Sequence, residues 1–219
     1  MKLKVCGMKY PENILKVGNL SPDYLGFIFY EKSPRNFMGP LPELPASIKK
    51  IGVFVKANID EVSEKVSQFK LNGIQLHGSE STAYIKQLKS KLQQEAQRGT
   101  IDKSPFIIKV FSIKDHFDFS TLKTYEPLVD YFLFDTKGAY AGGNGYTFNW
   151  ELLNNYPSEK PFFLSGGIGI AQLEAIEKIA SSLPVHAIDV NSQFEEEPGL
   201  KNSTLVKEFK TKLEEISSR

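Results

Sequence analysis

The chain has 219 residues, of which 41% are hydrophobic and 24% charged, and its formal net charge is +1. This balance is that of an ordinary globular protein, and it gives no overall field that would favour nucleic acid or an acidic membrane. No stretch approaches the roughly 20 apolar residues of a membrane span, no signal-like apolar segment precedes the first expected strand, and the single cysteine, Cys6, excludes an internal disulfide. We therefore expect a cytoplasmic protein with no membrane or nucleic-acid partner.

Short apolar runs recur along the whole chain and alternate with segments of helical spacing. Strands that alternate with helices pair in parallel, because a parallel return needs a crossover. Eight such units predict an α/β fold, a closed (β/α)8 TIM barrel with its active site at the carboxyl ends of the strands. An open doubly wound sheet is the alternative. The expected strands are residues 2–6, 24–29, 50–55, 73–77, 106–111, 131–135, 161–165 and 185–190, and the helical segments fall near 14–17, 59–69, 84–92, 117–122, 170–179 and 205–216.

The connections predict one domain with local irregularities. No low-complexity linker divides the chain, so residues 1–219 are expected to form a single barrel domain. Pro40, Pro42 and Pro45 predict a poorly formed helix after the second strand, because proline interrupts helices. The polar residues 93–104 are expected to form an elongated connection at the end of the barrel away from the chemistry.

Polar side chains stand at several expected strand ends. Cys6 ends the first run and Asp135 ends the sixth. Residues two apart share a face of a strand, so Lys4 would face the barrel interior together with Cys6. The same parity puts Gln75, His77 and Asp189 at the barrel mouth. Unpaired burial of such groups is costly, so this constellation indicates a functional site. Two plainer interpretations remain: Cys6 as a core filler, and Lys4 and Asp189 as partners that only satisfy one another.

Glycine-rich turns follow the last three expected strands. Backbone amides at such turns bind anions, and in barrels the loops after strands seven and eight frequently form a phosphate site. Gly166, Gly167, Asn191 and Ser192 are therefore the candidate phosphate-binding residues. The glycines at 142–145 are interpreted as a mobile lid beside Asp135. A further anion contact is expected from Arg35, which follows Ser33-Pro34 and could hold a carboxylate through paired hydrogen bonds.

The chain resembles the phosphoribosylanthranilate isomerase family over essentially its whole length. The motifs that carry the resemblance lie at seven of the eight expected strand ends: Lys4-Val5-Cys6-Gly7-Met8-Lys9, Gly26-Phe27-Ile28-Phe29 with Ser33-Pro34-Arg35, Gly52-Val53-Phe54-Val55, Gln75-Leu76-His77-Gly78, Phe134-Asp135-Thr136 leading to Gly142-Gly143-Asn144-Gly145, Ser165-Gly166-Gly167-Ile168, and Asp189-Val190-Asn191-Ser192. The family pattern is not followed at Gln193, Asn149 and Asn202. Gln193 replaces a glycine of the last phosphate turn, whereas the two asparagines are expected to cap helices as well as the usual aspartates do.

The resemblance implies an Amadori rearrangement in tryptophan biosynthesis. N-(5′-phosphoribosyl)anthranilate would become 1-(2-carboxyphenylamino)-1-deoxyribulose 5-phosphate, with Cys6 as general base and Asp135 as general acid. Arg35 would address the anthranilate carboxylate, the turns at Gly166-Gly167 and Asn191-Ser192 would hold the phosphate, and no cofactor or metal would be needed. We also expect substrate contacts from Gln75, His77 and Asp189, and a monomer or homodimer.

The thiol needs help to act as a base, because a free cysteine has a pKa of about 8.5. We expect Lys4 to supply part of that help. Two other functions compete with this one. A related phosphosugar aldose–ketose isomerase would use two aspartates, and Cys6 in the first strand argues against it. A non-catalytic barrel that binds a phosphorylated metabolite would have no need of both Cys6 and Asp135.

Overall fold

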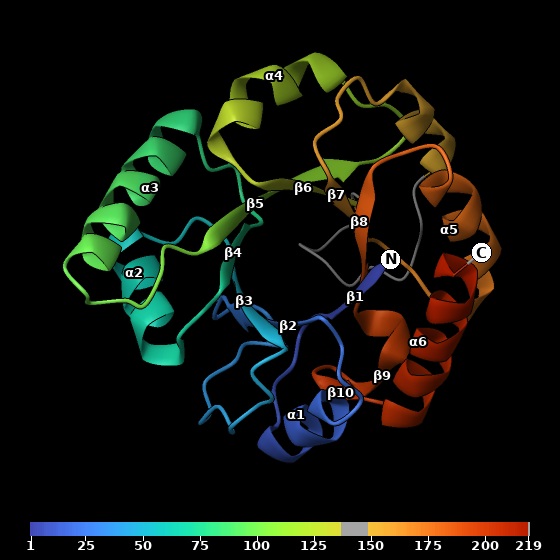
Figure 1. Cartoon of the computed structure of the whole chain (residues 1–219), viewed down its shortest axis with the longest axis horizontal. Coiled ribbons are helices and arrows are strands. Elements are labelled where there is room, and N and C mark those ends of the chain that lie inside the picture. Colours follow the sequence, from blue (N-terminus) through green and yellow to red (C-terminus); the bar gives the residue numbers. More distant parts are fainter. Residues whose placement is uncertain (137–148, 219) are drawn as a thin grey trace.

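The computed structural model describes residues 1–136 and 149–218 and contains a closed barrel of eight parallel strands. The strands follow one another around the barrel in chain order, and β1 closes it by pairing with β8, as Figure 1 shows. This confirms the (β/α)8 prediction and excludes the open sheet. The observed strands are β1 (Lys2–Val5), β2 (Tyr24–Phe29), β3 (Lys49–Phe54), β4 (Gly73–Leu76), β5 (Phe106–Ile113), β6 (Tyr131–Thr136), β7 (Phe162–Leu164) and β8 (Val185–Val190).

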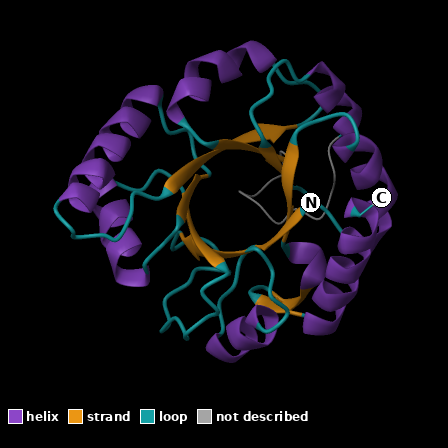
Figure 2. Ribbon diagram, viewed as in Figure 1, coloured by secondary structure: helices purple, strands orange, loops and turns teal. Residues whose placement is uncertain are grey.

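The helices lie outside the ring of strands (Figure 2). They are α1 (Pro11–Gly18), α2 (Ile59–Phe69), α3 (Thr82–Gln97), α4 (Leu122–Tyr125), α5 (Leu173–Ala180) and α6 (Ser203–Ser217). No helix forms between β2 and β3, as the three prolines of that segment predict. Asn202 caps α6 by accepting a hydrogen bond from the amide of Leu205, and Asn149 caps the short 3-10 turn Trp150–Asn155 in the same way. None of the helices among the described residues is both long and apolar enough to cross a bilayer.

The expected connection at 93–104 is wrong in its first half. Helix α3 continues through Gln97, because residues 93–97 are good helix formers and follow the buried Leu92 without a break. The helix ends where Gly99 adopts a left-handed backbone conformation with φ of 74°. The connection is therefore shorter than expected.

A second feature was not predicted at all. A two-stranded antiparallel ribbon, β9 (Glu195–Glu197) with β10 (Leu200–Lys201), lies between β8 and α6.

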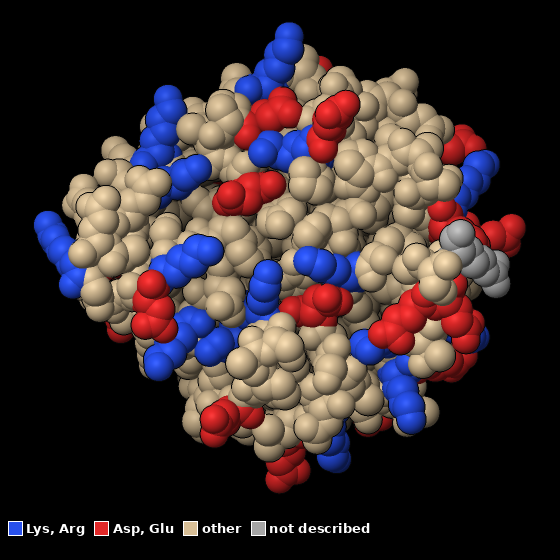
Figure 3. Space-filling view, viewed as in Figure 1, with Lys and Arg blue, Asp and Glu red and all other residues tan. Residues whose placement is uncertain are grey.

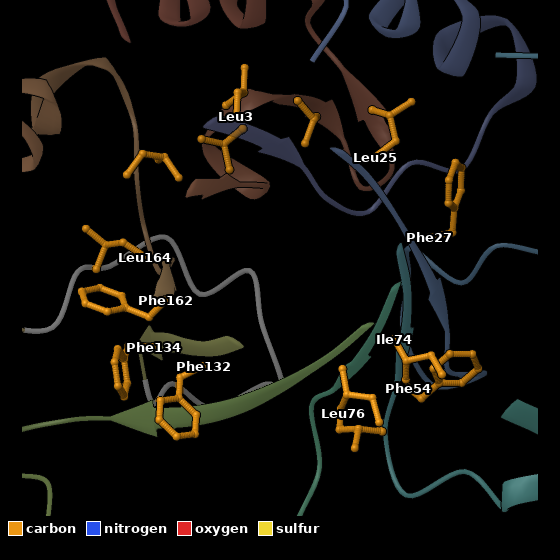
Figure 4. Close-up of a cluster of buried hydrophobic side chains, with 14 of the residues drawn as sticks. Leu3, Leu25, Phe27, Phe54, Ile74, Leu76, Phe132, Phe134, Phe162 and Leu164 are labelled. Carbon is orange, nitrogen blue, oxygen red and sulfur yellow. The ribbon is translucent and has the colours of Figure 1, made fainter. Parts of the chain in front are cut away.

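Side chains alternate between two cores, as the pleat of a strand requires. The outward-facing residues pack beneath the helices, and Figure 4 shows Phe132, Phe134 and Phe162 pointing together into this layer. Inward-facing residues fill the barrel itself: Tyr24, Ile51, Ile108, Val110, Leu133, Phe163 and Ala187. Charged side chains of both signs are interspersed over the face visible in Figure 3, in keeping with a net charge near zero.

One end of the barrel interior is closed by aromatic rings around His186. The Nε2 atom of His186 lies 2.8 Å from the Tyr24 hydroxyl, and its ring centroid is 4.4 Å from that of Tyr131. Burial lowers the pKa of His186 to about 4, and the charges of Lys2 and Lys49 act in the same direction. The imidazole therefore stays neutral and shares a hydrogen bond with the Tyr24 hydroxyl, which fits a scaffold role.

This neutral histidine predicts a loss of stability in mild acid. An unfolded histidine titrates near 6.5, so between about pH 6.5 and pH 4 the unfolded chain binds a proton that the folded chain does not. The free energy of unfolding, measured by urea denaturation, should fall as the pH is lowered through this window. His186→Gln should flatten the fall, whereas His116→Gln, at an exposed position, should not. Equal slopes in the native chain and the His186 variant would contradict this interpretation.

Candidate active site

A single pocket at the carboxyl ends of the strands gathers every predicted site residue. Cys6 comes from the turn after β1, Asp135 from β6 and Asp189 from β8, and the glycine turns close one side. The predicted residues that line the pocket are Cys6, Arg35, Gln75, His77, Asp135, Gly166, Gly167, Asp189, Asn191 and Ser192. The expected lid at 142–145 lies outside the described residues. Among the described residues, no three or more His, Cys, Asp or Glu side chains are grouped as metal ligands.

Beneath the pocket, the ammonium group of Lys4 is completely buried in the barrel. Its Nζ donates to Oδ1 of Asp189 at 2.9 Å and to Oε1 of Gln75 at 2.7 Å. The expectation that Lys4 and Asp189 face the interior together is confirmed. The two residues do not contact only each other, because Lys4 also donates to Gln75 and Asp189 also lines the pocket.

The Lys4 contact determines the orientation of a longer chain of hydrogen bonds. An ammonium group only donates, so the atom of Gln75 that it contacts must be the amide oxygen. The amide nitrogen of Gln75 then donates to Nδ1 of His77 at 3.1 Å, and this network assigns the histidine proton to Nε2. Nε2 lies 3.3 Å from Oδ2 of Asp135, within ion-pair distance, although it has no hydrogen bond of good geometry to any described residue. A polar chain thus connects Lys4 with Asp135 across the barrel.

The loop that carries His77 is held by a buried ion pair. Lys109 of β5 contacts Glu80 with its Nζ 3.1 Å from Oε2, and it donates to the carbonyl oxygens of Leu76 and Gly78 at 3.4 and 2.5 Å. The carboxylate of Glu80 in turn accepts the amide N–H of Gly78. The two residues that flank His77 are therefore fixed, which restrains the direction in which its ring points.

Burial dominates the chemistry of the Cys6 thiol. It raises the pKa of Cys6, and the charge of Asp189 adds to the rise, whereas the positive charges of Lys4 and Lys201 oppose it. The net pKa lies above the ordinary value. Lys4 therefore acts in the predicted direction, but its effect on the pKa of Cys6 does not outweigh that of burial.

The two carboxylates of the pocket are held differently. Oδ1 of Asp135 accepts the amide N–H of Thr136 at 2.8 Å, which leaves Oδ2 toward His77. Oδ2 of Asp189 accepts the Ser165 hydroxyl at 3.2 Å. Burial raises the pKa of Asp189, and Lys4 and Ser165 counteract part of this rise.

The turn after β7 requires glycine. Gly166 and Gly167 have φ angles of 92° and 66°, a region that other residues rarely adopt. A Cβ on Gly166 would also come within 2.6 Å of the Thr136 amide nitrogen. Glycine therefore lets this turn pack directly against the end of β6. After β8, Asn191 precedes the short 3-10 turn Ser192–Phe194, and Gln193 at the non-family position lines the pocket.

Arg35 reaches the pocket but is already paired. Its guanidinium binds the carboxylate of Glu195 on the ribbon, with Nη2 2.7 Å from Oε2. Lys201, on the adjacent strand of the ribbon, contacts the same carboxylate at 2.7 Å. Glu195 and Lys201 were not among the residues predicted from the sequence. The available signal was Pro198-Gly199 between them, a turn dipeptide that indicates a reversal of the chain.

The closed barrel and the acid–base groups at its strand ends define an enzyme of the TIM-barrel class. The family model described as N-(5'phosphoribosyl)anthranilate (PRA) isomerase matches residues 3–212, and the chain belongs to this family of isomerases. The resemblance inferred from the motifs is confirmed.

Individual relatives agree with this assignment. N-(5'-phosphoribosyl)anthranilate isomerase of Parabacteroides distasonis is 44% identical over 217 residues, with 95% of this chain and 91% of the relative covered. The crystal structure of phosphoribosyl anthranilate isomerase from Thermotoga maritima is similar, with a TM-score of 0.78 and 27% identity over 98% of this chain and 99% of that one. Another isomerase structure, in complex with reduced 1-(o-carboxyphenylamino)-1-deoxyribulose 5-phosphate, has a TM-score of 0.76 and 25% identity over 98% and 99%.

The geometry around Cys6 predicts the effect of removing its nearest cation. Lys4→Met should raise the pKa of Cys6, measured from the pH dependence of alkylation by iodoacetamide, because the positive charge is lost and Asp189 is left uncompensated. Lys2→Met, two residues earlier on the same strand, serves as the control. An unchanged alkylation pKa would reject the role of Lys4. If Lys4→Met does not fold, Lys4→Gln retains a donor for Asp189 and tests the same charge.

Proposed function

We propose that this protein converts N-(5′-phosphoribosyl)anthranilate into 1-(2-carboxyphenylamino)-1-deoxyribulose 5-phosphate, an Amadori rearrangement in tryptophan biosynthesis. The observation that carries the proposal is that Cys6 and Asp135, from the ends of β1 and β6, line the same pocket as two glycine or polar turns suited to a phosphate. Membership of the isomerase family supports it, as does the relative that binds a reduced form of the product.

Asp135 is the general acid of the proposed reaction. In its protonated form it gives a proton to the ring oxygen of the aminofuranose, and the bond from that oxygen to C1 breaks. The nitrogen lone pair forms a C1=N double bond, so the open chain is an iminium ion. Asp135 is suited to this step because it ends β6 inside the pocket, with Oδ1 fixed by the Thr136 amide.

Cys6 is the general base of the second step. The iminium ion acidifies the neighbouring carbon, C2, and the thiolate of Cys6 takes the C2 proton. The electron pair of that bond moves into the C1–C2 bond and neutralises the nitrogen, which gives an enolamine that tautomerises to the ketone. One proton has entered at oxygen and one has left from carbon, so substrate and product are isomers. Both residues return to their starting forms by proton exchange when the product leaves.

The remaining pocket residues hold the ends of the substrate. Gly166, Gly167, Asn191 and Ser192 bind the phosphate through backbone and side-chain donors, and Arg35 binds the ring carboxylate. Gln75, His77 and Asp189 line the same pocket. We assign them to the ribose and to the orientation of the two catalytic groups, because Gln75 and His77 form the polar chain from Lys4 to Asp135. The chemistry assigned to these residues calls for no cofactor or metal.

The proposal extends to the setting of the enzyme. Residues 1–219 act as one barrel domain, as a monomer or homodimer in the cytoplasm, and the partner is a phosphorylated small molecule rather than nucleic acid or a membrane. The absence of a linker supports a single domain, and the balanced charge supports a small-molecule partner.

Removal of either proton-transfer group should nearly abolish turnover. Cys6→Ala and Asp135→Asn should each lower kcat by about 10²–10⁴-fold, the usual contribution of a positioned acid or base. Turnover is followed by the fluorescence change of the anthranilate adduct, and folding is checked by circular dichroism. The native chain should rescue a tryptophan auxotroph that lacks this isomerase.

Three results would contradict the assignment. Rescue by the Cys6→Ala/Asp135→Asn double variant would reject the catalytic roles. Binding of the adduct by the native chain without turnover would favour the non-catalytic phosphometabolite barrel. Turnover of another phosphosugar aldose but not of the anthranilate adduct would favour a related isomerase.

A further inference from the structure

A carboxylate outside the predicted site, that of Glu195, fixes the orientation of the Arg35 guanidinium. Nε of Arg35 lies 2.9 Å from Oε1 and 3.0 Å from Oε2 of Glu195, and Nη2 lies 2.7 Å from Oε2. The Glu195 side chain is 5% exposed and that of Arg35 is 12% exposed, so water competes little for this pair. Such a two-pronged contact fixes the plane of a guanidinium as well as its position.

The contact with Glu195 also determines which N–H groups remain for a ligand. A guanidinium has five N–H donors in a fixed plane. Glu195 occupies the side edge, formed by Nε and one N–H of Nη2. The end edge, formed by Nη1 and the second N–H of Nη2, is the remaining pair that can bind a carboxylate through two parallel hydrogen bonds. Arg35 lines the pocket, so the orientation of this edge decides where a carboxylate can be bound.

Lys201 connects this pair to the turn after β8. Its side chain is fully buried, and its Nζ lies 2.7 Å from Oε1 of Glu195, 2.6 Å from Oδ1 of Asn191 and 3.2 Å from the Asn191 carbonyl oxygen. Burial alone would raise the pKa of Glu195, but Arg35 and Lys201 together hold it below the ordinary value, so the carboxylate is charged. Burial lowers the pKa of Lys201 to about 8, with Glu195 opposing the change.

Gly7, the residue after Cys6, leaves room for two side chains of this network, those of Arg35 and Asn191. Gly7 has a φ of 74°, and a Cβ at this position would come within 2.7 Å of Oδ1 of Asn191 and 2.8 Å of Cδ of Arg35. The arginine and the asparagine therefore pack directly on the residue that follows the thiol. A displacement of either side chain would change the position of a bound ligand relative to Cys6.

We propose that Glu195 and Lys201 are positioning residues, and that Glu195 determines the specificity of the pocket for a substrate with a ring carboxylate. Glu195 turns the end edge of the Arg35 guanidinium toward the pocket, and Lys201 ties this orientation to Asn191 at the phosphate turn. The two ends of the substrate are thereby held at a fixed separation over Cys6. The inference rests on the proposed function, in which Arg35 binds the ring carboxylate.

The test compares two ligands that differ only in the carboxylate. One is reduced 1-(o-carboxyphenylamino)-1-deoxyribulose 5-phosphate, and the other is the same reduced compound made from aniline. Dissociation constants are measured by calorimetry for the whole chain and its variants. Glu195→Gln should weaken binding of the carboxylated ligand by about tenfold or more, the scale of a charge-assisted hydrogen bond, and should change binding of the aniline ligand less than twofold.

Lys201→Met gives a different pattern. It should weaken binding of both ligands, because Lys201 supports Asn191 as well as Glu195. The matched controls are Glu196→Gln and Lys207→Met, which alter exposed neighbours on the ribbon and on α6 and should leave both constants unchanged. If Glu195→Gln does not fold, Glu195→Asp withdraws the carboxylate by one methylene group and should give the same selective loss.

The outcomes separate this inference from the proposed function. If Glu195 only competes with the ligand for Arg35, Glu195→Gln would tighten binding of the carboxylated compound, and this result or an unchanged constant would overturn the inference. Equal weakening of both ligands by Glu195→Gln would also overturn it. Arg35→Met tests the proposed function itself: if it retains the native preference for the carboxylated ligand, Arg35 does not bind that carboxylate. Loss of the preference in Arg35→Met but not in Glu195→Gln would reject only the positioning role.

Discussion

The polar interior of this barrel depends on the buried ammonium group of Lys4. A charge inside a barrel is tolerated when it is paired and hydrogen-bonded, and Lys4 meets both conditions through Asp189 and Gln75. Because an ammonium group has no acceptor, the orientation of the Gln75 amide follows, and from it the position of the His77 proton. The same positive charge opposes the rise that burial causes in the pKa of Cys6. One side chain therefore influences both the hydrogen bonds that lead to Asp135 and the electrostatics around Cys6.

The fold and the set of residues that line the pocket were predictable because they depend on short-range patterns. Strand parity places Lys4 on the inner face of β1 and Gln75 on that of β4, and Cys6 continues the alternation just beyond the end of β1. Closure of the barrel then brings the strand ends together. Turn chemistry is equally local. Gly166 and Gly167 adopt left-handed conformations that favour glycine, so their presence in the sequence already indicated a turn of this kind.

The features that could not be predicted depend on distances between remote residues or on a balance of opposing effects. Arg35 and Glu195 are 160 residues apart, and the sequence around each residue gives no indication that it pairs with the other. The net pKa of Cys6 is a difference between burial and several charges, and a sequence shows the charges but not the burial. The extension of α3 to Gln97 was missed because polar residues on an exposed helical face resemble those of a loop.

The ribbon formed by β9 and β10 has a consequence for how this family member can vary. Lys201 stands opposite Glu195 across the ribbon, with a register irregularity beside it. Surface loops ordinarily accept added or deleted residues at little cost. Here a single insertion between the two strands would slide one past the other and turn one of the paired side chains to the opposite face. The length of this small surface element is therefore constrained by the buried side chains that it brings against Arg35.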